Sequence, residues 1–158
     1  MAKKQVHWQP VAVDPPPLSN RQWYVFSIAG FVLLIAGILQ LINFADFSDN
    51  FASLGITPPR LWAAIIILGE LWGAASFFKL RLSYAFRMVS NFWALFVSLF
   101  WFYQNIRIVS MGSQTDFSGS NFFGHFLSQT PGWWTVLEST LLLTFVLYAL
   151  SVSLSARK

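Results

Sequence analysis

The chain contains no cysteine among its 158 residues. Disulfide bonds, thiolate nucleophiles, iron–sulfur clusters and cysteine-ligated zinc sites are therefore excluded. Membrane thiol oxidoreductases built on four helices carry their chemistry on cysteine pairs, so that class of enzyme is excluded as well.

Charged residues are also scarce. Asp, Glu, Lys and Arg make up 10% of the chain, whereas hydrophobic residues make up 56%. A soluble domain carries about a quarter charged residues, so lipid is expected to be the solvent for most of this chain. The net charge of +4 is spread over short segments between apolar runs. Because this builds no continuous basic stripe, nucleic acid is not an expected partner.

Histidine is represented only by His7 and His125. Neither belongs to a metal-binding pattern, and neither lies within an apolar run, where it could ligate a haem. A catalytic metal, a Ser-His-Asp arrangement and a Gly-rich phosphate loop all lack the residues they require. No covalently bound cofactor is implied, and a quinone or a lipid stays open as a diffusible ligand.

Four long apolar runs dominate what is present. The first has no charged residue and can cross a hydrocarbon core of about 30 Å at 1.5 Å per residue. We predict an all-α protein, a bundle of four transmembrane helices. The predicted spans are residues 23–44, 61–78, 84–104 and 133–154. The remaining segments are a proline-containing tail (1–22), outer loops (45–60 and 105–132) and a short C-terminal tail (155–158).

The distribution of Lys and Arg predicts the orientation of these spans. Eight of the ten basic residues lie in the N-terminal tail, around the connection between the second and third spans, or at the C-terminus. Only Arg60 and Arg107 lie on the other side. Cytoplasmic loops are enriched in Lys and Arg, so both termini are predicted to be cytoplasmic.

Aromatic residues gather near the predicted span ends, where Trp and Tyr commonly anchor a helix at the membrane interface. The anchoring role is favoured over cofactor stacking for the whole set: Trp23, Tyr24, Trp62, Trp101, Tyr103, Trp133 and Trp134.

Glu70 is the most informative polar residue, because it lies near the middle of the second span. It sits between Gly69 and Gly73, which form a GxxxG pattern that lets another helix approach closely. Gly30 and Gly37 offer similar small packing positions in the first span. The carboxyl is therefore expected to point into the bundle or toward a partner helix.

Two interpretations of Glu70 stay open. It can be a proton-handling or quinone-contacting carboxyl, with Asn91 and Arg87 completing a polar site. The favoured interpretation is a protonated structural acid, hydrogen-bonded to Asn91, to Ser90 or to a neighbouring backbone group. Arg87, at a helix end, is expected to extend its head group to the cytoplasmic interface, the alternative being a lipid phosphate or a quinone head group.

Glu138 lies one turn into the fourth span. At a similar depth it can meet Gln40 of the first span or Gln104 of the third. An interhelical hydrogen bond is the expected role for this set of residues.

The two outer connections carry phenylalanines among polar residues. Phe117, Phe122, Phe123 and Phe126 lie in the long one, and Phe47 and Phe51 in the other. Loops longer than about 12–15 residues are usually functional or disordered. We expect both connections to form one docked outer surface, either on the bundle or against another subunit.

Residues 36–79 resemble the first half of DoxX-like membrane proteins. The resemblance rests on a glycine-containing first span, a Phe-rich connection, the turn Leu54-Gly55-Ile56-Thr57-Pro58, and a second span in which Glu70 is followed by Gly73. It covers roughly a third of the chain well. The resemblance implies a four-helix fold, a bacterial cytoplasmic (inner) membrane location and an association with membrane redox systems. Some such proteins are subunits of thiosulfate:quinone oxidoreductases.

Three functions are consistent with these observations. The first is a non-catalytic accessory subunit of a larger redox-linked complex, which contacts lipids and other subunits through its membrane faces and outer loops. The second is a quinone-reactive oxidoreductase subunit with a polar site around Glu70. The third is a small transporter or lipid-binding protein, disfavoured because no internal repeat or broken span is present. The chain is not expected to be an enzyme by itself.

Overall fold

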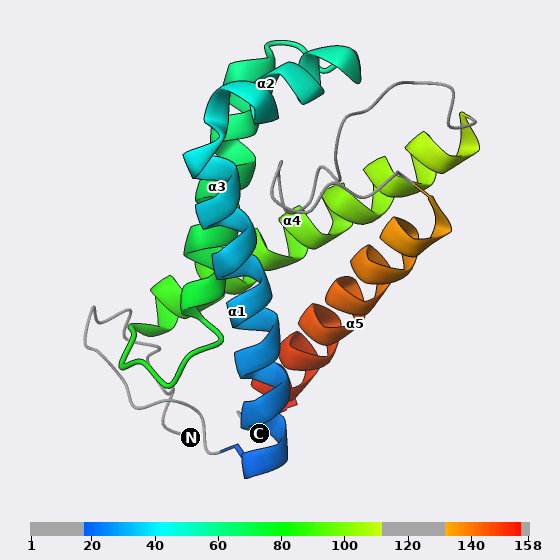
Figure 1. The fold of residues 1–158 in the computed structure, drawn as a ribbon. Coiled ribbons are helices and arrows are strands. Elements are labelled where there is room, and N and C mark those ends of the chain that lie inside the picture. The colour runs from blue at the N-terminus through cyan, green and yellow to red at the C-terminus, as the bar shows by residue number, and fades with distance from the viewer. Residues whose placement is uncertain (1–17, 112–131, 156–158) are drawn as a thin grey trace, which may run out of the picture.

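The computed structural model describes residues 18–111 and 132–155. These residues form five α-helices: α1 (Asn20–Ile42), α2 (Phe44–Ser53), α3 (Pro59–Ala75), α4 (Tyr84–Ser110) and α5 (Trp133–Ser155). Figure 1 shows the four long helices side by side, with the short α2 across one end. The predicted all-α fold class is confirmed.

Local capping sets where two of the helices begin. The side chain of Ser19 accepts a hydrogen bond from the backbone N–H of Gln22, and the Gln22 side chain accepts from the Ser19 backbone N–H. This reciprocal pair is a capping box, and it starts α1 three residues before the predicted span. Ser83 caps α4 in the same way by accepting from Phe86 N–H.

The segment 45–60, predicted as an outer loop, contains most of the helix α2. Phe47 and Phe51 of α2 lie one turn apart and are each 1% exposed, so burying one face stabilises the helix. The helix ends at Ser53, and Gly55, two residues later, has a φ of +73°, a left-handed conformation that glycine adopts without strain. The Phe-bearing connection thus docks through a helical face.

The helix α4 is longer than the predicted third span. α4 continues to Ser110, so residues 105–110 are helical and belong to no loop. Its buried residues continue at helical spacing through Asn105 and Ile108, and the Asn105 side-chain amide donates to the Thr135 carbonyl of α5 at 3.1 Å. Packing against α5 therefore extends the helix. Residues 112–131, with the phenylalanines of the long loop, lie outside the described residues.

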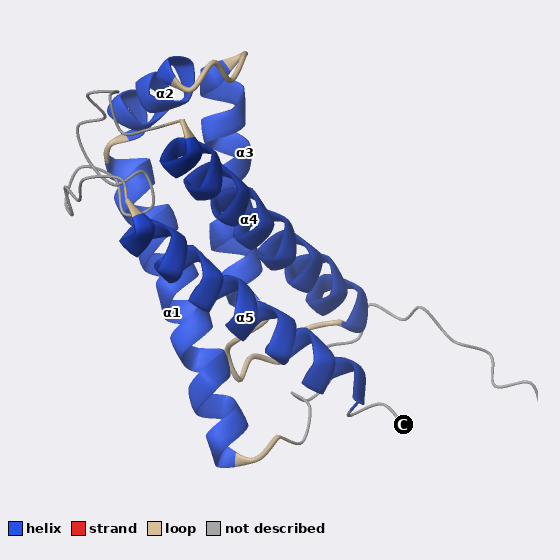
Figure 2. Cartoon of the chain, turned by 90° about the vertical axis from the view of Figure 1, so that its right-hand side faces the viewer, coloured by secondary structure: helices blue, strands red, loops and turns tan. Residues whose placement is uncertain are grey.

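The long helices form a closed ring in which each contacts its sequence neighbour. α1 packs on α3, α3 on α4, α4 on α5, and α5 returns to α1, while α2 packs mainly on α3. The start of α1, the connection from α3 to α4 and the end of α5 lie at the lower end of the bundle in Figure 1. Figure 2 shows α2 at the opposite end.

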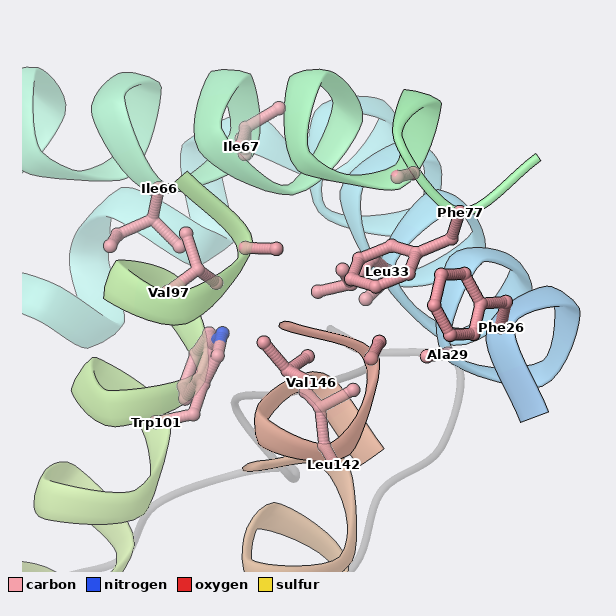
Figure 3. Close-up of a cluster of buried hydrophobic side chains, with 14 of the residues drawn as sticks. Phe26, Ala29, Leu33, Ile66, Ile67, Phe77, Val97, Trp101, Leu142 and Val146 are labelled. Atoms are coloured by element: carbon pink, nitrogen blue, oxygen red, sulfur yellow. The ribbon is translucent and has the colours of Figure 1, made fainter. Parts of the chain in front are cut away.

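Apolar side chains fill the ring and also cover its outside. Figure 3 shows the core, where residues such as Leu33, Ile66, Val97 and Val146 from four helices meet. Phe92, by contrast, is 71% exposed and Leu68 62%.

Among the described residues, α1, α4 and α5 are long and apolar enough to cross a membrane. α3, with 17 residues, is shorter.

Candidate functional site

Glu70 lies at a junction of three helices. Its Oε1 atom accepts a hydrogen bond from Nε2 of Gln40 on α1 at 3.1 Å, and a second from Nε1 of Trp101 on α4 at 2.7 Å. Glu70 and Gln40 are 0% exposed, and Trp101 is 1% exposed. A carboxyl inside α3 therefore connects the helices on either side of it.

Small residues make this junction possible. A Cβ atom on Gly37 of α1 would lie 2.9 Å from the Leu71 side chain and 3.3 Å from Cβ of Glu70. A Cβ atom on Gly73 of α3 would lie 2.9 Å from the backbone nitrogen of Ala94 on α4. Gly30 faces Phe77 and Phe78, just after the end of α3, and Gly69 faces Trp93 and Val97 of α4. The four glycines bring α1 and α4 close enough for the side chains of Gln40 and Trp101 to reach Glu70.

One oxygen of the Glu70 carboxyl makes no hydrogen bond to the described part of the chain. Oε2 of Glu70 is buried and has no hydrogen-bond partner there, and the same holds for Oε1 of Gln104. Gln104 follows Trp101 by one turn on the same face of α4. A carboxyl of this kind can carry its proton on Oε2 and donate it to an acceptor, or accept from a further donor.

Aromatic rings of α2 lie next to this junction. The ring centroids of Phe47 and Trp101 are 6.1 Å apart, and Phe51 stacks on Phe100 of α4 at 5.6 Å. α2 therefore covers the end of the bundle nearest to Glu70. The buried indole of Trp101 is visible in Figure 3, between the side chains of α3 and those of α5.

Two predictions about this region were wrong. Within the described residues Glu70 makes no hydrogen bond to Asn91 or Ser90, because the close contact of Gly73 with Ala94 places Asn91 one turn farther toward the α3–α4 connection. Trp101 was expected at the membrane interface, yet it is buried and donates to Glu70. Asn91 and Ser90 are themselves buried, on the inner face of α4.

Arg87 does not extend to the interface either. It is 8% exposed, and its guanidinium donates to the backbone carbonyls of Ser76 at 3.2 Å and Leu80 at 2.9 Å. The last carbonyls of a helix lack intrahelical partners, so the end of α3 provides acceptors that a buried arginine can use. Arg87 therefore fixes the α3–α4 connection and is not part of the Glu70 junction.

The burial of Trp101 could have been predicted from its position in the sequence. Buried positions recur along α4 every three or four residues, a stripe that includes Arg87, Asn91, Ala94, Trp101 and Gln104. Its position on this stripe places the indole inside the bundle, whereas its residue type alone suggests the membrane interface.

Glu138 lies on α5, one turn after Thr135, and is partly buried. Because the Thr135 carbonyl accepts from Asn105, this part of α5 lies beside the part of α4 that carries Trp101 and Gln104. In the described part of the chain, no group of three His, Asp or Glu residues could hold a metal ion. His7 and His125 lie outside it.

Comparison with known proteins identifies the family. Residues 27–105, half of the chain, match the DoxX family. The chain belongs to the DoxX family. The matched segment of this DoxX protein contains Gln40, Glu70 and Trp101, so the whole three-helix junction lies within it, and DoxX proteins are membrane proteins. Searches of curated proteins and of solved structures find no match.

Proposed function

We propose that this DoxX protein is a non-catalytic accessory subunit of a larger, redox-linked complex in the bacterial cytoplasmic membrane. The observation that supports the proposal is the structural role of Glu70. Oε1 of this fully buried acid is bound by donors from α1 and α4, so the carboxyl holds the bundle together. The chain offers packing surfaces and supplies no metal centre or thiol chemistry of its own in the described residues.

The outside of the bundle supports a role among other membrane components. Large apolar side chains are exposed on each of the four long helices, including Phe31, Leu68, Phe92 and Leu147. Such faces contact lipid tails, and a second transmembrane subunit can pack on the same surface.

We further propose that α3 is the fourth span and that both termini are cytoplasmic. A helix of 17 residues rises about 26 Å, close to a hydrocarbon core of about 30 Å. The start of α1, the α3–α4 connection and the end of α5 lie at one end of the bundle, which is also the end with the excess of Lys and Arg.

The test is to solubilise the membrane in a mild detergent, separate the complexes on a native gel, and identify by mass spectrometry what migrates with this protein. We expect a defined large complex with fixed stoichiometry. Migration alone or as a small homo-oligomer, at several detergent concentrations, contradicts the accessory role.

A second candidate is a quinone-reactive oxidoreductase subunit. The observation that favours it is the pair of unused buried acceptors, Oε2 of Glu70 and Oε1 of Gln104. A protonated Glu70 can donate a hydrogen bond from Oε2 to a quinone carbonyl. The ligand-facing residues in this case are Glu70, Gln104 and Trp101, and Asn91 and Arg87 are not among them.

The two candidates are separated by extracting the purified protein with organic solvent and assaying the extract for quinone. Stoichiometric quinone that is lost in Glu70→Gln and Gln104→Leu variants supports the second candidate. Its absence from wild-type protein, purified with the native lipids retained, supports the accessory role.

A further inference from the structure

A hollow lies at the lower end of the bundle, where α1 begins and α3 has just ended. Asn20, Trp23, Tyr24, Ser27 and Lys79 line a cavity of about 310 Å³. This volume lies at the lower limit of ligand pockets in proteins. Among the described residues, the lining has one cation, several hydrogen-bonding groups and no carboxylate, so its chemistry suits an anion.

The position of the Lys79 ammonium in this hollow is fixed by a contact with Trp23. The Lys79 ammonium lies 5.2 Å from the centroid of the Trp23 ring, a distance typical of a cation–π contact. Trp23 is itself 7% exposed and packs edge-on against Phe26 at 5.7 Å. A buried indole therefore positions an exposed lysine over the mouth of the cavity, with its three N–H donors available.

An apolar strip continues from the same hollow along α1. Tyr24, Ile28, Phe31 and Ile35 follow at helical spacing on one face and are 72%, 50%, 54% and 47% exposed. The Phe31 ring also contacts Phe78, which follows α3, at 5.2 Å. A polar hollow with a cation thus joins an exposed apolar strip that runs toward the middle of the bundle.

We propose that this site binds an anionic glycerophospholipid, with its phosphate in the hollow and an acyl chain along the strip. Lys79 neutralises the phosphate, and Asn20, Ser27 and the Tyr24 hydroxyl donate hydrogen bonds to its oxygens or to the glycerol. Basic pockets between transmembrane helices bind anionic headgroups in this way. Free inorganic phosphate shares the headgroup chemistry, but it leaves the strip uncovered and binds more weakly. This inference does not depend on which of the proposed functions is correct.

The experiment uses the full chain, purified in detergent, delipidated and mixed with phosphatidylglycerol or phosphatidylcholine. Native mass spectrometry then measures how much lipid each variant retains. We expect wild-type protein to retain one phosphatidylglycerol in preference to phosphatidylcholine, and excess inorganic phosphate not to displace it. Lys79→Ala should weaken retention about fivefold, the effect of one Lys at a charged membrane surface, whereas Lys79→Arg should keep it.

Two further variants make the result specific. Ser27→Leu fills the hollow without changing the charge and should also weaken the retention of phosphatidylglycerol. Arg60→Ala removes an exposed cation at the opposite end of the bundle and should leave retention unchanged. The proposal is overturned if Lys79→Ala and Arg60→Ala reduce retention equally, if both lipids bind alike, or if inorganic phosphate displaces the lipid.

Discussion

At the scale of single residues, Glu70 decides how the interior of the bundle is organised. An ionisable group buried among apolar side chains is costly and needs polar partners. Here the partners are an amide and an indole, each of which donates to the same oxygen. The carboxyl is thus held from two directions, and its role in holding the bundle together depends on its acceptor oxygen.

Replacing Glu70 by glutamine tests whether its hydrogen-bond acceptor or its exchangeable proton is needed. In Glu70→Gln the side-chain oxygen can still accept from Gln40 and Trp101, so the melting temperature in detergent should change little. In Glu70→Leu both donors lose their acceptor, and the loss should be about 1–3 kcal/mol, since interhelical hydrogen bonds in membranes are worth about 0.6–1.7 kcal/mol each. Circular dichroism during heating measures the difference.

Equal destabilisation by the two substitutions would contradict the hydrogen-bonding role. If Glu70→Gln folds normally but the associated membrane complex loses electron transfer to quinone, the exchangeable proton of Glu70 is needed and the second candidate function is supported.

Sequence reasoning identified the buried acid but not its partners. The composition of the second span singles out Glu70, since an acid among apolar residues stands out. The partner depends on the register between two helices, and a shift of one turn moves Asn91 away from the acid and brings Trp101 to it. Contact of Gly73 with Ala94 sets that register, and spacing along one chain does not contain this information.

At the scale of elements, glycine positions control how closely the helices approach. Gly73→Ala places a methyl group 2.9 Å from the Ala94 backbone nitrogen, so α3 and α4 have to separate. Gly37→Ala meets the Leu71 side chain at 2.9 Å and the Cβ atom of Glu70 at 3.3 Å, but no backbone atom among its three nearest neighbours, and the partly exposed Leu71 side chain can rotate. Both changes gain the same helix propensity, so their difference reports packing alone.

We expect Gly73→Ala to destabilise the protein by about 1–3 kcal/mol, as overpacked cores do, and Gly37→Ala by less than about 1 kcal/mol. Thermal unfolding of both variants in the same detergent measures this difference. Similar melting temperatures for the two would show that α3 and α4 can move apart without cost.

The α3–α4 connection depends on a side chain within α4. Arg87→Ala removes both hydrogen bonds to the carbonyls of Ser76 and Leu80, so the backbone of residues 76–83 should exchange amide hydrogen faster. Hydrogen–deuterium exchange with mass spectrometry measures the change. Lys79→Ala, in the same connection, leaves these two bonds intact and serves as the control.

The helix α2 shows why the connections are harder to predict than the spans. Long apolar runs are recognised from composition because lipid is their solvent. The short helix Phe44–Ser53 packs on α3, and its Phe47 and Phe51 rings contact Trp101 and Phe100 within α4. A segment with mixed polar and aromatic residues is therefore helical only because the bundle provides a surface for it.

At the scale of the whole molecule, the absence of cysteine makes the topology directly testable. Single cysteines can be introduced at the exposed positions Ser19, Thr57 and Leu80 without any background thiol. A membrane-impermeant maleimide should label Thr57→Cys in intact spheroplasts, and Ser19→Cys and Leu80→Cys only after the membrane is opened. Equal labelling of Thr57→Cys and Leu80→Cys in intact spheroplasts would show that α3 does not cross.

The two hydrogen-bond donors to Glu70 are synthesised at different times. Gln40 precedes Glu70 by 30 residues, and Trp101 follows it by 31. A ribosome therefore delivers α3 when one partner of its acid is already in the membrane and the other is still to be synthesised. Synthesis of α4 supplies Trp101, the second donor to Glu70, so we expect α1 and α3 to associate through Gln40 before α4 packs on them. The carboxyl that stabilises the mature bundle therefore gains its second donor only after α4 has been synthesised.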